Sequence, residues 1–116
     1  MFRMRYRGLL SGNGGAAAVS PTANFTVPAG QIWKGYFALD GIVTSGSGQV
    51  EMRLEDQGGT IYHIWGQNSV TIGSGSIQCI NSGEMTLGPG NYRIKAGGNF
   101  SAANGTVYYM GTLYSA

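Results

Sequence analysis

The stretch Val50-Glu51-Met52-Arg53-Leu54-Glu55 alternates apolar and charged side chains without a break. Because successive side chains of an extended strand point to opposite faces, this pattern predicts a β-strand with one buried and one solvent-facing side. Asp56-Gln57-Gly58-Gly59 follows, and such a polar, glycine-rich tetrapeptide is typical of a hairpin turn. A second apolar run then occupies residues 60–65, so the region as a whole predicts a β-hairpin.

Outward from this hairpin, short apolar runs alternate with glycine, proline or asparagine turns over most of the chain. No long segment shows a helical apolar period free of glycine. We therefore predict an all-β fold, a jelly-roll-like β-sandwich of about eight short antiparallel strands with an extended N-terminal arm. Besides 50–55 and 60–65, the predicted strands are 24–27, 31–39 with a continuation at 41–44, 69–72, 76–80, 84–87, 92–96 and 106–113.

The chain of 116 residues has room for one domain with a single core. Charged residues make up 10% of it, whereas about 25% is ordinary for soluble domains. Such a low charge is typical of a surface that neighbouring subunits cover. Cys79 is the only cysteine, which excludes an intramolecular disulfide, and we expect it to be a small core residue.

The sequence lacks the long apolar run of a membrane span and the apolar segment of a signal peptide. We therefore expect a soluble protein made in the cytoplasm, with no membrane partner.

The first residues alternate strictly between apolar and basic side chains. The alternating residues are Phe2, Met4 and Tyr6 on one face and Arg3, Arg5 and Arg7 on the other. The glycine-, alanine- and serine-rich segment at 11–18 has the composition of a flexible linker. We therefore predict an N-terminal arm and linker over residues 1–19 and a single β-sandwich domain over residues 20–116.

The sequence offers little for catalysis. His63 is the only histidine and alternates with Ile61 and Trp65 along a predicted strand, so we expect it to be buried and hydrogen-bonded. Without a second histidine or a nearby cysteine, a zinc site is not expected. Glu55 and Asp56 are adjacent and would face opposite ways, which makes them a poor acid–base pair. No G-x-S-x-G motif is present, so a hydrolase is the least supported class, and we predict no enzyme, metal or cofactor.

Four tyrosines are predicted to point away from the core. On the strand at 31–39, for example, Trp33 and Phe37 share one face and Tyr36 takes the other. Outward aromatic side chains beside Asn and Gln indicate either a subunit interface or a platform for sugars, and the low charge favours the interface. The candidate interface residues are Tyr36, Tyr62, Tyr108 and Tyr114.

The three N-terminal arginines fit an edge strand or an arm that lies on an acidic protein shell. Nucleic-acid binding would need a basic face across the whole domain. Only four basic residues remain outside the arm, and the net charge is +2. We therefore expect no nucleic-acid partner.

Two stretches carry a resemblance to phage structural proteins. Residues 25–36, Phe-Thr-Val-Pro-Ala-Gly-Gln-Ile-Trp-Lys-Gly-Tyr, resemble the strand entry of small virion β-domains, including head decoration proteins and tail-fibre tips. Residues 87–94, Leu-Gly-Pro-Gly-Asn-Tyr-Arg-Ile, resemble the return strand common in jelly rolls. Together they cover about a fifth of the chain.

The resemblance implies a capsid decoration (cement) protein, a trimeric jelly roll bound outside the phage head, with residues 2–7 engaging the major capsid protein. Its location would then be the capsid exterior of the virion. The alternative is a tail-fibre or receptor-binding tip, or a small lectin, in which the outward tyrosines bind glycans.

Overall fold

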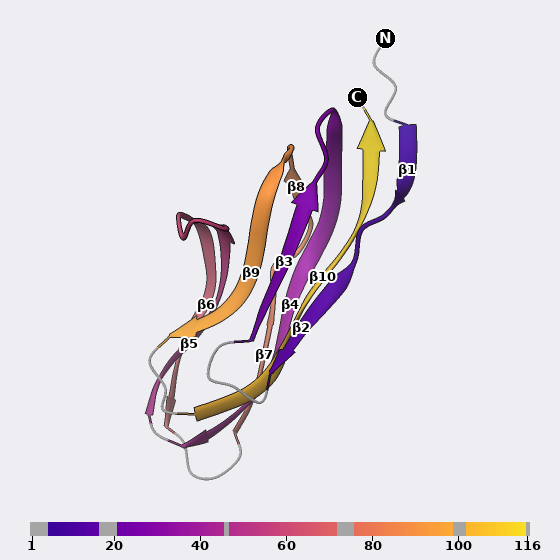
Figure 1. Ribbon diagram of the computed structural model, residues 1–116. Helices are drawn as coiled ribbons and strands as arrows, with labels where there is room; N and C mark the ends of the chain where they lie inside the picture. The colour runs from indigo at the N-terminus through magenta and orange to yellow at the C-terminus, as the bar shows by residue number, and fades with distance from the viewer. Residues whose placement is uncertain (1–4, 17–20, 46, 72–75, 99–101, 116) are drawn as a thin grey trace.

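The structure, a computed structural model, describes residues 5–16, 21–45, 47–71, 76–98 and 102–115 (Figure 1). Its ten strands form two antiparallel sheets, which confirms the predicted all-β sandwich. The six-stranded sheet contains β1 (Arg5–Leu9), β2 (Gly12–Ala16), β4 (Gln31–Ser45), β7 (Ser76–Asn81), β8 (Met85–Leu87) and β10 (Ala102–Ser115). The four-stranded sheet contains β3 (Thr22–Val27), β5 (Ser47–Asp56), β6 (Ile61–Thr71) and β9 (Gly90–Gly98). The described residues include no helix long and apolar enough to cross a membrane.

The strand order is that of a jelly roll. β1 and β2 both pair with β10, and β7 and β8 both pair with β4, so the ten strands occupy eight strand positions. The first position is β1 with β2, the sixth is β7 with β8, and the eighth is β10. The six-stranded sheet runs β1-β10-β4-β7, and the other sheet runs β3-β9-β5-β6. Numbered by position, these orders are 1-8-3-6 and 2-7-4-5, as in the double Greek key of jelly rolls.

The core lies between the two sheets and follows the alternation seen in the sequence. Trp33, Phe37, Met52 and Leu54 are all fully or almost fully buried, as their positions on the predicted strands require. Phe25 lies at the centre of an aromatic cluster, with its ring centroid 4.7–5.7 Å from those of Trp33, Phe37, Tyr92 and Tyr109. The long strands β4 and β10 pair along most of their length and run the long dimension of a molecule measuring 55 × 23 × 21 Å (Figure 1).

Trp33 is held by a pair of glycines and by a distant carbonyl. Gly35 and Gly111 are partners across β4 and β10, and a Cβ on either would overlap the indole ring of Trp33. The indole nitrogen donates a 3.0 Å hydrogen bond to the carbonyl oxygen of Leu10, between β1 and β2. The ring thus lies flat on two strands and fixes the position of a third segment.

The described part of the predicted arm belongs to the sheet. Arg5–Leu9 and Gly12–Ala16 form β1 and β2 along β10, so the flexible-linker interpretation is wrong for Gly12–Ala16. The glycines there permit close packing, because a Cβ at Gly12 would overlap the Tyr109 ring and one at Gly14 the carbonyl of Thr22. Residues 1–4 and 17–19 lie outside the described residues, so the proposed boundary near residue 20 stays a prediction.

The predicted hairpin turn after β5 is confirmed. The Asp56 carboxylate accepts hydrogen bonds from the backbone nitrogens of Gly58 at 2.9 Å and Thr60 at 2.8 Å. The hydrogen bond from Thr60 contributes most to lowering the pKa of Asp56 below its ordinary value. A second turn joins β3 to β4, where Gly30 has a φ of 76°, a conformation that side chains rarely adopt.

The indole packing predicts that Gly111→Ala destabilises the fold. Its methyl group would have to displace the Trp33 ring, and overpacking of this kind costs about 1–3 kcal/mol. We expect a fall in Tm of about 4–10 °C, measured by thermal unfolding followed by circular dichroism. Gly88→Ala is the matched control, because Gly88 has open space around its Cβ position and should unfold at or slightly above the wild-type temperature. Equal Tm values for the two variants would contradict this account of the core.

Candidate functional site

The outer side of the six-stranded sheet carries a row of aromatic and aliphatic side chains. Since Trp33 and Phe37 of β4 and Val107 of β10 point into the core, the even-numbered residues that alternate with them point outward. We call this surface the aromatic face. Its residues on the two central strands are Lys34, Tyr36, Ala38 and Asp40 of β4 and Tyr108, Met110, Thr112 and Tyr114 of β10.

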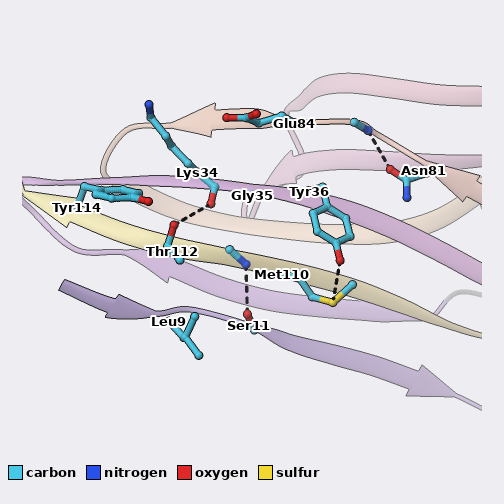
Figure 2. A pocket seen from close by; sticks show the side chains of 12 residues that line it. Leu9, Ser11, Lys34, Gly35, Tyr36, Asn81, Glu84, Met110, Thr112 and Tyr114 are labelled. Atoms are coloured by element: carbon cyan, nitrogen blue, oxygen red, sulfur yellow. Dashed lines mark hydrogen bonds between the residues drawn. The ribbon is translucent and has the colours of Figure 1, made fainter. Parts of the chain in front are cut away.

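A ridge crosses the middle of the aromatic face. Tyr36 and Met110 are partners across β4 and β10, and the Tyr36 hydroxyl donates a hydrogen bond to the Met110 sulfur at 3.4 Å (Figure 2). Tyr36 is 39% exposed, which is unusual for an aromatic residue in a central strand. Tyr36, Met110 and Asn81 line a hollow on each side of this ridge.

The first hollow has a volume of about 870 Å³ and combines apolar walls with a few polar groups. Lys34 and Glu84 supply its charges, and the Lys34 amino group lies 6.0 Å from the centre of the Tyr114 ring. Thr112 donates to the carbonyl of Lys34 at 3.5 Å, and the Ser11 hydroxyl accepts from the Gly111 nitrogen at 3.2 Å (Figure 2). The hydroxyl groups of Ser11 and Thr112 are therefore bonded to backbone, and that of Tyr36 to a sulfur.

The second hollow, of about 560 Å³, has Asp40, Cys79, Ala38 and Tyr108 in its wall. The Cys79 thiol donates a hydrogen bond to the Asp40 carboxylate at 3.6 Å. This bond and the neighbouring negative charge favour the protonated thiol and raise the pKa of Cys79. The expectation that Cys79 is a core residue is wrong: it is exposed, because Ile80 takes the inward position on β7.

Three of the four predicted interface tyrosines come together on the aromatic face. They are Tyr36, Tyr108 and Tyr114. Tyr62 lies instead on the edge strand β6 of the other sheet, 55% exposed and 5.9 Å from the Tyr92 ring centre. The alternation of the sequence predicted that all four tyrosines lie on the strand face that points away from the core. It did not show which of the two sheets each strand joins. Their role as an interface stays a prediction.

The described arm residues lie at one end of the aromatic face. Tyr6 is a partner of Tyr114, with ring centres 6.3 Å apart, and Arg7 donates to the Ser115 hydroxyl at 3.0 Å. Arg5, Tyr6 and Arg7 are all exposed. Phe2, Arg3 and Met4 lie outside the described residues.

The outer side of the four-stranded sheet is different in character. We call it the charged face; its residues are Glu51, Arg53, Glu55, Arg93 and Lys95. Glu55 is 2% exposed and pairs with Arg93 at 2.5 Å and with Lys95 at 3.6 Å. Arg53 pairs with Glu51 at 2.9 Å, and that hydrogen bond raises the pKa of Arg53. The sequence predicted the outward direction of these groups on β5 but not that basic side chains would cover the carboxylates.

His63 does not occupy the predicted environment. It is exposed on β6, which pairs only with β5 and so forms an edge of the described four-stranded sheet. Its ring centre lies 4.4 Å from that of Trp65. Within the described residues, no group of three or more His, Cys, Asp or Glu side chains could hold a metal ion.

Comparison with known proteins gives a fold and no family. No family model matches the chain, and no curated protein matches it. PorU from Porphyromonas gingivalis aligns with 96% of this chain over 13% of its own length, at 11% identity and a TM-score of 0.54. A chain of the infectious bursal disease virus Gx strain aligns with 98% of this chain over 37% of its own, at 12% identity and a TM-score of 0.49. The bacteriophage CBA120 tailspike protein 4 domain aligns with 92% of this chain over 19% of its own length, at 15% identity and a TM-score of 0.32.

This chain therefore spans little more than a third, or less, of the chains it resembles. A viral chain and a phage tailspike domain are among these weak neighbours. At such identities the likeness is one of fold alone, and the PorU match supports the two-sheet fold described above.

The contact between Cys79 and Asp40 predicts how the thiol reacts. Asp40→Asn removes the negative charge, so the pKa of Cys79 should fall toward its ordinary value and the thiolate should form at lower pH. We expect faster alkylation by iodoacetamide at neutral pH and a pH–rate profile displaced to lower pH, measured in dilute protein. Asp56→Asn on the other sheet is the control and should leave the rate unchanged. Identical profiles for Asp40→Asn and wild type would contradict the assignment.

Proposed function

We propose that this chain is a virion structural protein, a decoration subunit that binds the outside of a phage head and stabilises contacts between capsomers. The observation that carries the proposal is the aromatic face. Tyrosine and methionine are enriched in protein interfaces, and contiguous exposed apolar surface on a small domain marks an interaction site. The fold agrees with this role, since jelly rolls recur in viral capsid domains.

The basic N-terminal end supplies the contact with the shell, and the aromatic face is left for contact between subunits. Arg5 and Arg7 are exposed and form no ion pair within the described part of the chain. Unpaired guanidinium groups are suited to carboxylates on another protein. We assign them to the major capsid protein, in the role first predicted for the arm. Because β1 belongs to the sheet, deletion of residues 1–12 would also expose the edge of β10, so point substitutions test this contact better.

The alternative is a receptor-binding tip or small lectin. The observation that favours it is the first hollow, where Tyr36 and Tyr114 lie with Lys34 and Glu84. Sugars stack on aromatic rings and form hydrogen bonds with polar neighbours. The hollow is wide and open, however, and the hydroxyl groups of Ser11, Thr112 and Tyr36 already form hydrogen bonds within the chain. We therefore rank protein contact above glycan contact.

The proposal predicts saturable co-sedimentation of the purified protein with mature heads of the phage that encodes it. The double variant Arg5→Glu, Arg7→Glu should bind about tenfold more weakly, since each lost exposed pair contributes up to about 1 kcal/mol and repulsion adds to it. Arg5→Lys, Arg7→Lys keeps the charge and should bind nearly as wild type. Asn24→Glu, exposed on the other sheet, is the control for an added negative charge.

Absence of binding to any head, mature or immature, would remove the decoration role. Binding on a glycan array in that case would establish the alternative. Equal binding by the wild type and the glutamate variant would keep the decoration role but remove the arginines from the contact.

A further inference from the structure

We propose that the aromatic face binds a second copy of this chain, face to face and with the strands of the two copies antiparallel. The pair would have a two-fold axis lying in the interface and crossing the strands at the level of Phe37 and Tyr109. The inference deepens the proposed function and rests on it only in taking the aromatic face as a protein-binding surface.

The charges of β4 support this arrangement. Lys34 and Asp40 both point outward and lie three residues before and after Phe37, about 20 Å apart along the strand. Neither forms an ion pair in the part of the chain that the structure describes. Reversal of the strand about the Phe37 level brings each Lys34 opposite the Asp40 of the other copy. Two equivalent ion pairs then close the two ends of the interface.

The shape of the face repeats the same symmetry. The two-fold axis exchanges the level of Tyr36 and Met110 with the level of Ala38 and Tyr108. The ridge of each copy therefore lies over the second hollow of the other, where Ala38 has the smallest side chain on the outer side of β4. A large side chain meets a small one on β4, and methionine meets tyrosine on β10.

Other arrangements of two copies are less favourable. An axis parallel to β4 would place Lys34 against Lys34 and Asp40 against Asp40, and like charges across an interface repel each other. The charged face is not an alternative, because its acids and bases already pair within one chain. A two-fold contact of this kind uses the same patch on both copies and closes at two subunits, so the trimer implied by the resemblance would need another surface.

A charge-exchange experiment tests the inference. Sedimentation equilibrium of the full chain should give a dimer. Lys34→Asp and Asp40→Lys each create two like-charge contacts and should weaken the dimer about tenfold or more. The double variant Lys34→Asp, Asp40→Lys exchanges the charges and should restore the wild-type dissociation constant. Asn24→Lys on the other sheet is the control, and circular dichroism checks that every variant is folded.

Cys79 provides a second readout that needs no change of charge. It is exposed in one copy and lies in the wall of the second hollow, which the other copy would cover. Its alkylation rate should therefore fall as the concentration of wild-type protein rises through the dissociation constant. Ala38→Trp fills that hollow, so it should give a monomer whose alkylation rate does not depend on concentration.

Three results would overturn the inference. They are a wild-type chain that stays monomeric at all concentrations, a trimer unaffected by either single substitution, and a double variant no better than the single ones. Co-sedimentation with phage heads separates this from the proposed function. A charge-sensitive dimer that binds no heads would leave the inference standing and remove the decoration role, whereas a monomer that binds heads would do the reverse.

Discussion

The position of the Trp33 indole is the constraint on which the rest of the structure depends. The ring is fully buried, lies on the paired glycines Gly35 and Gly111, and bonds through its nitrogen to the carbonyl of Leu10. The glycines bring the backbones of β4 and β10 directly beneath the ring, and the hydrogen bond holds the first strand position against the eighth. Loss of this bond would leave a part-buried carbonyl without its partner, at a cost of about 1–3 kcal/mol. One residue thus connects the core, the central strand pair and the N-terminal strands.

The same constraint determines the outer surface. Because Trp33, Phe37 and Leu39 must face the core, strand geometry forces Lys34, Tyr36, Ala38 and Asp40 to the other side of β4. β10 is paired with β4 in continuous register over these residues, so its outward residues fall beside them. The ridge between Tyr36 and Met110 therefore follows from the packing of the core.

Alternation in the sequence was enough to predict the all-β class, most of the strands, the buried face of β5 and the outward direction of Tyr36, Tyr108 and Tyr114, although the separately predicted strands 60–65 and 69–72 are one strand, β6. It could not predict the strand role of Gly12–Ala16, because flexible linkers and closely packed strands share the same small residues. What distinguishes them here is contact with Thr22 and Tyr109, and Tyr109 is remote in sequence. Cys79 and His63 were misplaced for a related reason. An apolar run shows that a strand exists, but burial of each residue also depends on whether the strand lies at a sheet edge and which neighbour faces inward.

The two outer faces differ in the free energy needed to remove them from water. On the charged face, Glu55 is already buried under Arg93 and Lys95, so a partner placed there would strip the remaining water from guanidinium and ammonium groups that have no further acid to meet. On the aromatic face, the groups between Lys34 and Asp40 of β4 and beside them on β10 are tyrosine, methionine and alanine, so the two charges flank an uncharged centre. Covering the centre releases water from apolar surface at about 25 cal/mol per Å², while the charges at the rim can keep water or find an opposite charge. This asymmetry favours association through the six-stranded sheet and leaves the four-stranded sheet toward solvent.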